Sequence, residues 1–187
     1  MAMPKAKAKK IVVIIFFVIL AIWGILVLIF DPELLGIHKI NQTIKMNFND
    51  STYTIEIPSA WEETESEDMP NATVYSSDHA MVACEFTSYS DVSTKFKEIL
   101  EEQESAFTLI SSSCNESYDD DEFNCKMGTG HLFYCEYDDV AMQKFIIDEG
   151  TGMLGVVYYI DTNDLTDTEK QEFVDLGEKI LKSIDKK

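Results

Sequence analysis

Residues 44–57 read IKMNFNDSTYTIEI, and this stretch predicts an antiparallel β-hairpin. Apolar side chains occupy every second position on both sides of residues 49–52, which have the composition of a turn. Pairing Phe48 with Tyr53 across that turn places six apolar side chains on one face: Ile44, Met46, Phe48, Tyr53, Ile55 and Ile57. Because a half-buried strand pair needs one apolar face, the stretch predicts a sheet that rests on a core.

The C-terminal end of the chain predicts a long amphipathic helix that follows a buried strand. Thr166 and Glu169 have the spacing of a capping box, in which each side chain bonds the backbone of the other residue. Apolar side chains then recur at helical spacing along one face: Phe173, Leu176, Ile180, Leu181 and Ile184. Residues 152–160 (GMLGVVYYI) are apolar on both faces, which is typical of a strand that is central or covered by a helix.

The middle of the chain predicts further strands around one more helix. Short runs at residues 72–76 and 80–86 indicate two strands. Asp91 or Ser93 can cap a helix, and its inward stripe is expected to contain Phe96, Ile99, Leu100, Gln103 and Phe107. Four more strands are expected, at residues 107–115, 122–127, 131–138 and 141–148. This order predicts an α+β fold in which two helices pack on an antiparallel sheet meander.

Residues 11–30 (IVVIIFFVILAIWGILVLIF) form an uncharged apolar run that predicts a transmembrane helix. These 20 residues, at about 1.5 Å each, span the roughly 30 Å of a bilayer's hydrocarbon core. The lysines that precede the run place the N-terminus in the cytoplasm. A cleaved signal peptide is the alternative, but its apolar region would be about 7–15 residues long and would end in a small-x-small site. The predicted organisation is a cytoplasmic basic stub (1–10), a transmembrane anchor (11–30), a stalk (31–43) and an extracytoplasmic α+β domain (44–187).

The charge of the chain restricts its partners. It contains 34 acidic residues against 15 basic ones, its formal net charge is −19, and it has no arginine. All of the acidic residues follow residue 30. Such an excess repels the phosphates of nucleic acids, so nucleic acid is excluded as a partner. A solvated face that keeps the domain soluble is one interpretation of the charge, and a specific cationic partner or a cation store is the other.

The sequence contains no recognisable catalytic or cofactor-binding motif, and we assign no catalytic residue, cofactor or metal site. His38, His79 and His131 are too scattered for a zinc motif. An acidic run could supply carboxylates to calcium, and it consists of Asp119, Asp120, Asp121 and Glu122. An ordinary acidic hairpin tip is the competing interpretation of that run.

A second acidic stretch imitates the calcium loop of an EF-hand. Asp161, Asn163 and Glu172 have the spacing of three of its ligands. Leu165 stands where another ligand is needed, and Thr166 stands where the loop needs glycine. An ordinary helix cap at Thr166 therefore competes with this calcium site.

The four cysteines predict structural disulfides. Cys84, Cys114, Cys125 and Cys135 all follow the predicted membrane segment, and outside the cytoplasm disulfides can persist. No Cys-x-x-Cys pair occurs, which argues against a thioredoxin-type site or a zinc ribbon. Folding the chain back about an acidic turn at residues 119–122 places Cys114 opposite Cys125, so we predict a disulfide between them. Cys84 and Cys135 would remain as a second pair, and free buried thiols are the alternative.

The run from Tyr53 to Trp61, a strand that ends in Ile-Pro-x-x-Trp, and the closing helix that ends at Ser183-Ile184 resemble a known superfamily. It is the superfamily of the photosystem II extrinsic protein PsbP and its bacterial lipoprotein relatives, and the resemblance covers roughly residues 44–185. It implies an α/β/α-type sandwich with a binding or assembly role and no catalysis. No functional residue can be carried over from it.

Three functions are therefore compared. The leading hypothesis is a membrane-anchored extracytoplasmic binding or assembly protein without catalysis, whose partners are the membrane, through residues 11–30, and an envelope protein or ligand. The alternatives are an envelope enzyme, such as a hydrolase with a dispersed site, and a calcium-dependent binding module. Convergent titratable residues in a cleft would favour the enzyme, and carboxylates gathered around one point would favour the calcium module.

Overall fold

The computed structural model describes residues 39–48, 51–66, 69–92 and 95–187. Residues Ile40–Lys187 form one compact unit. The predicted basic stub, the transmembrane segment 11–30 and most of the predicted stalk lie outside the described residues. The first strand begins at Ile40, so the last residues assigned to the stalk belong to the folded unit. Within the described residues, no helix has the length and the apolar composition that crossing a bilayer requires.

The described residues form two antiparallel sheets and three helices. The smaller sheet has the order β1 (Ile40–Phe48), β2 (Ser51–Pro58), β10 (Asp185–Lys186). The larger sheet has seven strands in the order β3 (Glu62–Thr64), β4 (Thr73–Ser76), β5 (Ala80–Ser88), β9 (Gly152–Asp161), β8 (Val140–Asp148), β7 (Gly128–Tyr137), β6 (Glu116–Cys125). The helices are α2 (Tyr89–Val92), α3 (Phe96–Ser111) and α4 (Asp167–Lys182). The predicted α+β class is confirmed, and β9 is the central strand of the larger sheet, as its apolar sequence predicts.

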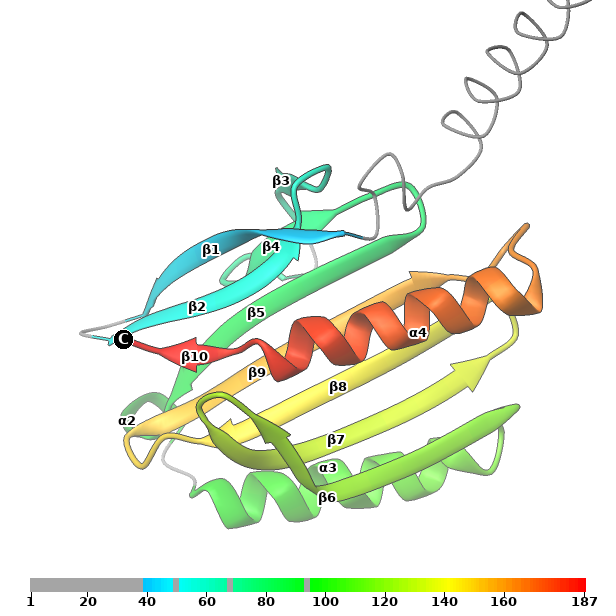
Figure 1. Ribbon diagram of the computed structural model, residues 1–187. Coiled ribbons are helices and arrows are strands. Elements are labelled where there is room, and N and C mark those ends of the chain that lie inside the picture. Colours follow the sequence, from blue (N-terminus) through cyan, green and yellow to red (C-terminus); the bar gives the residue numbers. More distant parts are fainter. Residues whose placement is uncertain (1–38, 49–50, 67–68, 93–94) are drawn as a thin grey trace, which may run out of the picture. The chain divides into compact units, whose positions relative to one another are not determined.

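The two long helices lie on opposite faces of the seven-stranded sheet (Figure 1). Gln143 of β8 points toward α4, where its Nε2 atom donates a 3.1 Å hydrogen bond to the carbonyl oxygen of Val174. Lys144, the next residue, points the other way, and its ammonium group donates a hydrogen bond to the side chain of Gln103 in α3. Because successive residues of a strand point to opposite faces, these two side chains define an α4 face and an α3 face of the sheet.

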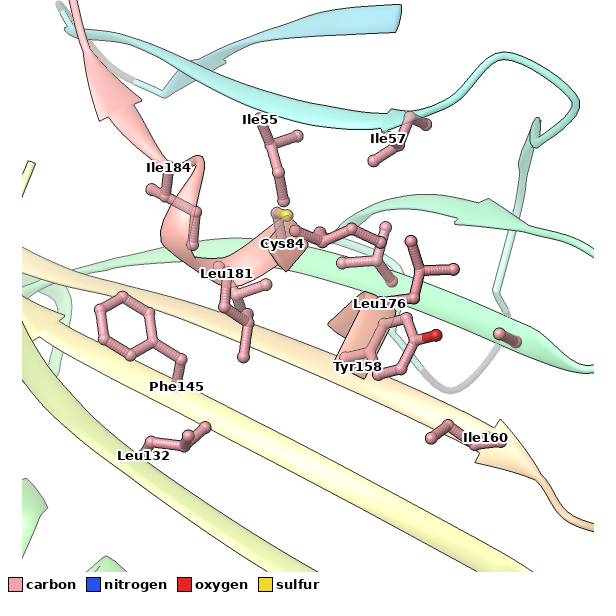
Figure 2. Close-up of a cluster of buried hydrophobic side chains, with 14 of the residues drawn as sticks. Ile55, Ile57, Cys84, Leu132, Phe145, Tyr158, Ile160, Leu176, Leu181 and Ile184 are labelled. Carbon is pink, nitrogen blue, oxygen red and sulfur yellow. The ribbon is translucent and has the colours of Figure 1, made fainter. Parts of the chain in front are cut away.

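The main hydrophobic core covers the α4 face (Figure 2). The small sheet joins α4 on this face, where the backbone N–H of Glu56 in β2 donates a 2.8 Å hydrogen bond to Ser183 Oγ. The labelled core side chains come from β2, β5, β7, β8, β9, α4 and the residues after α4: Ile55, Ile57, Cys84, Leu132, Phe145, Tyr158, Ile160, Leu176, Leu181 and Ile184. Burial of a large aliphatic or aromatic side chain stabilises a fold by about 1.5–3 kcal/mol, so this face contributes most of the apolar stabilisation.

Helix α4 matches its prediction closely. Thr166 is the N-cap residue, its hydroxyl accepts the N–H of Glu169, and the Glu169 carboxylate accepts the N–H of Thr166, which completes the capping box. The Thr166 hydroxyl also donates a 2.7 Å hydrogen bond to the Glu169 carboxylate, and this bond, with the one from the Thr166 N–H, holds the pKa of Glu169 below its ordinary value. The predicted apolar face is buried: Phe173, Leu176, Ile180, Leu181 and Ile184.

The hairpin of β1 and β2 forms with a different register from the predicted one. Phe48 lies opposite Ser51, where the alternation predicted Tyr53. Ser51 and Thr52 extend β2 instead of forming the turn, and the Thr52 hydroxyl donates a 2.9 Å hydrogen bond to Asn47 Oδ1. A shift of two residues keeps every side chain on its face, so the predicted apolar set still contacts the core.

The strand predicted at residues 107–115 is wrong, because residues 107–111 belong to α3. The N-cap of α3 is Lys95, where the sequence predicted Asp91 or Ser93. Strand β6 begins at Glu116 and its hairpin turn lies at residues 126–127, so the acidic run at 119–122 is inside a strand and is not a turn.

Candidate functional site

The structure contains one disulfide within its described residues, and it joins Cys114 to Cys135. The two α-carbons are 5.9 Å apart. The predicted bond between Cys114 and Cys125 is therefore wrong, and the second predicted pair, Cys84 with Cys135, does not form. The reason is the position of the hairpin turn: Cys125 lies beside it, opposite Gly128, while Cys114 lies before Glu116, which begins β6 at the other end of the strand.

The two free cysteines of the described residues have different surroundings. Cys84 is buried in the core, and burial raises the pKa of its thiol to about 12. Cys125 is half-buried, and burial also raises the pKa of its thiol. Both thiols are therefore held in the protonated form, which is the less reactive one.

An apolar groove of about 500 Å³ lies beside the disulfide. One wall comes from the C-terminal end of α3 and the residues after it: Leu109, Ile110, Ser113 and Cys114. The other wall comes from the hairpin of β7 and β8: Cys135, Tyr137, Val140 and Met142. The lining is mostly apolar, and its side-chain hydroxyl groups belong to Ser113 and Tyr137.

The sheet register explains why the second wall is continuous. Cys135 pairs with Met142, and Tyr137 pairs with Val140, across β7 and β8. Met142 and Val140 lie two and four residues before Lys144 in β8, so they point to the same face as Lys144, which is the α3 face. Their partners in β7, Cys135 and Tyr137, point to that face as well. Their side chains form one strip at the end of the sheet where the hairpin turns.

Three large apolar side chains that line the groove are exposed to solvent. Leu109 is 76% exposed, Ile110 is 47% exposed and Tyr137 is 52% exposed. Across the part of the chain that the structure describes, these are the exposed large hydrophobic residues, and all three line this groove. A contiguous exposed apolar patch with a polar rim marks a binding site more often than scattered single residues do.

The loose attachment of α3 leaves the groove open. None of the described residues of α3 is buried. The helix rests on the sheet through the rings of Phe107 and Phe133, whose centroids are 5.3 Å apart, and through those of Phe96 and His131, at 6.2 Å. Beneath it, burial lowers the pKa of Lys144. Two contacts therefore hold the C-terminal end of the helix to the sheet: the disulfide, and the packing of Phe107 on Phe133.

The acidic run of residues 119–122 does not form a metal site. It lies in β6, the edge strand of the larger sheet, and all four of its side chains are exposed: Asp119, Asp120, Asp121 and Glu122. Successive side chains of a strand diverge, so the carboxylates do not gather around one point. Charged side chains on an edge strand discourage pairing with a second sheet. This effect explains the acidic run, and no bound metal is needed to explain it.

Other predicted candidates are also dispersed. Because Thr166 caps α4, Glu172 lies within that helix, while Asp161 Oδ1 accepts the N–H of Asn163 at 3.0 Å. Among the residues that the structure describes, no group of three or more His, Cys, Asp and Glu side chains could hold a metal ion.

The two described histidines lie on different sides of the sheet. His79 contacts the ring of Phe173 in α4, at 6.1 Å between centroids, whereas His131 contacts Phe96 in α3. His38 lies outside the described residues.

The groove residues were missed by the sequence reasoning because residues 107–115 were predicted as a strand. A usable signal exists: the inward stripe Phe96, Leu100, Gln103 and Phe107 continues with the same spacing to Ile110. Extending the helix to that residue would have placed Leu109 and Ile110 at its end. The position of Tyr137 opposite them depends on tertiary structure and has no local signal.

The fold and the groove define an antiparallel α+β domain with an apolar groove at one end of its larger sheet. No protein-family model matches the chain, and no curated protein matches its sequence. Among solved structures, the chain is similar to LpqN of Mycobacterium tuberculosis, which is described as involved in cell envelope biogenesis. The TM-score is 0.45 at 13% identity, and the alignment covers 78% of this chain and 90% of the LpqN chain. Similarity at this level assigns neither a family nor a function, so the resemblance to the PsbP superfamily stays a prediction.

Proposed function

We propose that this protein is a membrane-anchored, extracytoplasmic binding protein that holds an apolar segment of another envelope component in the groove at the end of α3. The observation that supports the proposal is that Leu109, Ile110 and Tyr137 are exposed and line the same groove. Leaving these side chains in water forfeits the stabilisation of about 25 cal/mol per Å² that burial gives, and a bound apolar segment would recover it.

The chemistry of the lining supports binding over catalysis. Its side chains are aliphatic, disulfide-bonded or hydroxyl-bearing, and none is a carboxylate, histidine or lysine. General acid–base catalysis depends on a titratable group whose pKa lies near the working pH, and such a group is usually a histidine or a carboxylate. A groove of this composition suits the burial of apolar surface.

The proposed location rests on two independent features. The disulfide between Cys114 and Cys135 suits an oxidising compartment, because cytoplasmic thiols are kept reduced. The apolar run at residues 11–30, with four lysines before it and no small-x-small site after it, suits a retained anchor with the domain outside the cytoplasm.

The binding role can be tested by NMR with the full-length chain. Its methionines carry ¹³C-methyl labels, and the chain is reconstituted in phosphatidylcholine nanodiscs. The probe is an uncharged nine-residue peptide that carries Leu and Phe on one face and Gln on the other. Its binding should shift the methyl resonance of Met142, assigned with Met142→Leu, and should leave the resonance of the core residue Met46 unchanged.

The matched variants separate the groove from the rest of α3. Leu109→Gln should weaken peptide binding several-fold, since removing an apolar contact worth about 1–2 kcal/mol changes affinity about five- to thirtyfold. Ala106→Gln places the same side chain at another exposed position of α3 that does not line the groove, and it should bind like the unmodified chain. Equal affinities for the two variants, or a Met142 resonance that no peptide shifts, would refute the proposed function.

A further inference from the structure

We infer that the groove accepts a cationic amphipathic segment of a partner protein, one in which lysine or arginine residues flank apolar side chains. This inference rests on the proposed function and specifies its ligand. It follows from three observations: the carboxylates at the rim of the groove, their lack of basic neighbours, and the effect that the same carboxylates would have on other occupants.

Carboxylates surround the end of the groove that the β7–β8 hairpin forms. Asp138 and Asp139 make the turn between Tyr137 and Val140, which both line the groove, and both aspartates are exposed. Asp161 of β9 is the register partner of Val140, so it lies beside that side chain on the α3 face. Three negative charges therefore lie next to the apolar lining. Asp138 and Asp139 are neighbours of lining residues in the chain, and Asp161 is the neighbour of one across the strands.

These charges are not neutralised by the domain itself. Within the described residues, no lysine or histidine nitrogen lies within 4.0 Å of a carboxylate oxygen of Asp138, Asp139 or Asp161. The Asp161 carboxylate accepts hydrogen bonds from the backbone and side chain of Asn163, which leave its charge in place. Earlier turns of α3, before its groove-lining residues, carry further exposed carboxylates, Glu98, Glu102 and Glu104, whereas Glu101 is paired with Lys97 at 3.6 Å.

The same rim disfavours the other occupants of an apolar groove. The acyl chain of an anionic phospholipid would bring its headgroup phosphate toward the aspartates. A second copy of this chain, paired symmetrically through the groove, would bring Asp138 and Asp139 of each protomer toward those of the other. A cationic amphipathic segment can instead bury its apolar face and place its charges against the rim, an arrangement that also accelerates association.

The experiment compares three nine-residue peptides that share one apolar face and differ in their polar positions, which are Lys, Gln or Glu. Full-length protein in phosphatidylcholine nanodiscs is titrated with each peptide, and the Met142 methyl resonance reports binding. At about 50 mM salt the Lys peptide should bind about tenfold tighter than the Gln peptide, as expected for several exposed ion pairs, and the Glu peptide should bind more weakly than both. At about 500 mM salt the difference should largely disappear, because the Debye length falls below about 5 Å.

Two charge-removing variants locate the effect. Asp138→Asn with Asp139→Asn should abolish most of the preference for the Lys peptide while keeping the binding of the Gln peptide. Asn also tolerates the left-handed backbone at position 138, where φ is 45°, so the turn is retained. Glu62→Gln with Glu65→Gln removes the same charge from exposed positions in and beside β3, the strand at the opposite edge of the sheet from β6, and should keep the preference.

The outcomes distinguish the inference from the proposed function. Equal affinities of the Lys and Gln peptides at low salt would overturn the inference while the binding function stood. A Met142 resonance that shifts when phosphatidylglycerol replaces phosphatidylcholine, without peptide, would assign the groove to acyl chains. Dimers that Leu109→Gln dissociates would assign it to a second copy. A Met142 resonance that no peptide shifts would contradict the proposed function itself.

Discussion

Cys114, just beyond the end of α3, is bonded to Cys135 in β7, and both sulfur-bearing residues line the apolar groove. The bond fixes the C-terminal end of a helix in which no described residue is buried. It therefore positions Leu109 and Ile110 opposite Tyr137. Because this covalent bond joins the two walls of the groove, we expect the width of the groove to change when the disulfide is reduced.

Replacing both Cys114 and Cys135 by serine should loosen α3 and destabilise the domain. The residues are 21 apart in sequence, and closing a loop of that size contributes about 3.3 kcal/mol on the chain-entropy model. Denaturant unfolding measures the loss, and hydrogen exchange should accelerate in α3 more than in β8.

Cys125→Ser is the control for that experiment, because Cys125 is a free thiol. A reducing agent should lower the stability of Cys125→Ser as it lowers that of the unmodified chain, and it should leave the double serine variant unchanged. Unaltered exchange in α3 after loss of the disulfide would show that packing alone holds the helix.

Gly177 permits the close approach of α4 to the sheet, and Gly177→Ala should be destabilising. A Cβ atom at this position would lie 2.1 Å from Gln143 Oε1 and 2.5 Å from the Tyr158 ring. Overpacking of this kind costs about 1–3 kcal/mol, although alanine in a helix is ordinarily favoured over glycine by about 1 kcal/mol. The sign of the change in unfolding free energy therefore shows whether overpacking outweighs the better helix propensity of alanine.

Gly155→Ala provides the matched control in β9, where the nearest atom to an added Cβ is 3.9 Å away. This variant should unfold at nearly the same denaturant concentration as the unmodified chain. A stabilising Gly177→Ala would mean that α4 lies farther from Gln143 than the structure places it.

The proposed N-terminal anchor predicts a definite protease pattern. If residues 11–30 span the bilayer with the lysines on the cytoplasmic side, protease added to intact cells should degrade the chain beyond residue 35 and leave a small membrane-held fragment. Permeabilised cells provide the comparison, since the fragment should then lose its cytoplasmic end as well. Mature protein that is free in the medium and lacks residues 1–30 would indicate a cleaved signal peptide.

The elements that could be predicted are those whose local pattern and tertiary environment agree. The capping box of Thr166 and Glu169 and the apolar stripe after it specify α4 without reference to the rest of the chain. Residues 152–160 are apolar on both faces because β9 is central and each of its faces is at least partly covered.

The elements that could not be predicted are those in which tertiary pairing overrides local preference. The run of aspartates at 119–121 has a low strand propensity, yet these residues pair or bulge within β6 because β7 provides the partner. Mistaking that run for a turn displaced the hairpin and with it the expected disulfide. The rim aspartates at 138 and 139 fall where the strands predicted at residues 131–138 and 141–148 meet, but the groove beside them requires the position of α3, which no local pattern contains.

Tyr158→Phe should stabilise the domain, because the Tyr158 hydroxyl is buried without a hydrogen-bond partner in the described part of the structure. An unsatisfied buried polar group costs about 1–3 kcal/mol, so its removal should raise the unfolding free energy by roughly 1 kcal/mol. Tyr134→Phe is the contrasting variant, since the Tyr134 hydroxyl donates a 3.3 Å hydrogen bond to Glu136 and its loss should be destabilising. A destabilising Tyr158→Phe would point to an ordered water molecule that bonds this hydroxyl.

The stability of the domain should fall as the pH rises above about 10, near the ordinary pKa values of lysine and tyrosine. The Lys170 ammonium donates a 2.8 Å hydrogen bond to Glu136, which raises the pKa of Lys170. Burial, together with the Glu136 charge, raises the pKa of Tyr134. Between the unfolded and the higher folded pKa values the folded state binds more protons, so the unfolding free energy decreases as pH rises. The stabilising contribution is fully present below the unfolded pKa values and is lost as the pH passes through the folded ones.

Urea unfolding of the unmodified chain at pH 8, 9.5 and 11 measures this slope. The double variant Lys170→Met and Tyr134→Phe should start from a lower stability and lose less of it over the same interval, because neither side chain can then titrate. Some slope should remain, since burial also raises the pKa of Tyr118 and of Tyr158. Lys179→Met, at an exposed position of α4, should keep the slope of the unmodified chain. If the double variant and Lys179→Met lose stability in parallel, the contacts of Lys170 and Tyr134 with Glu136 do not govern the loss of stability at high pH.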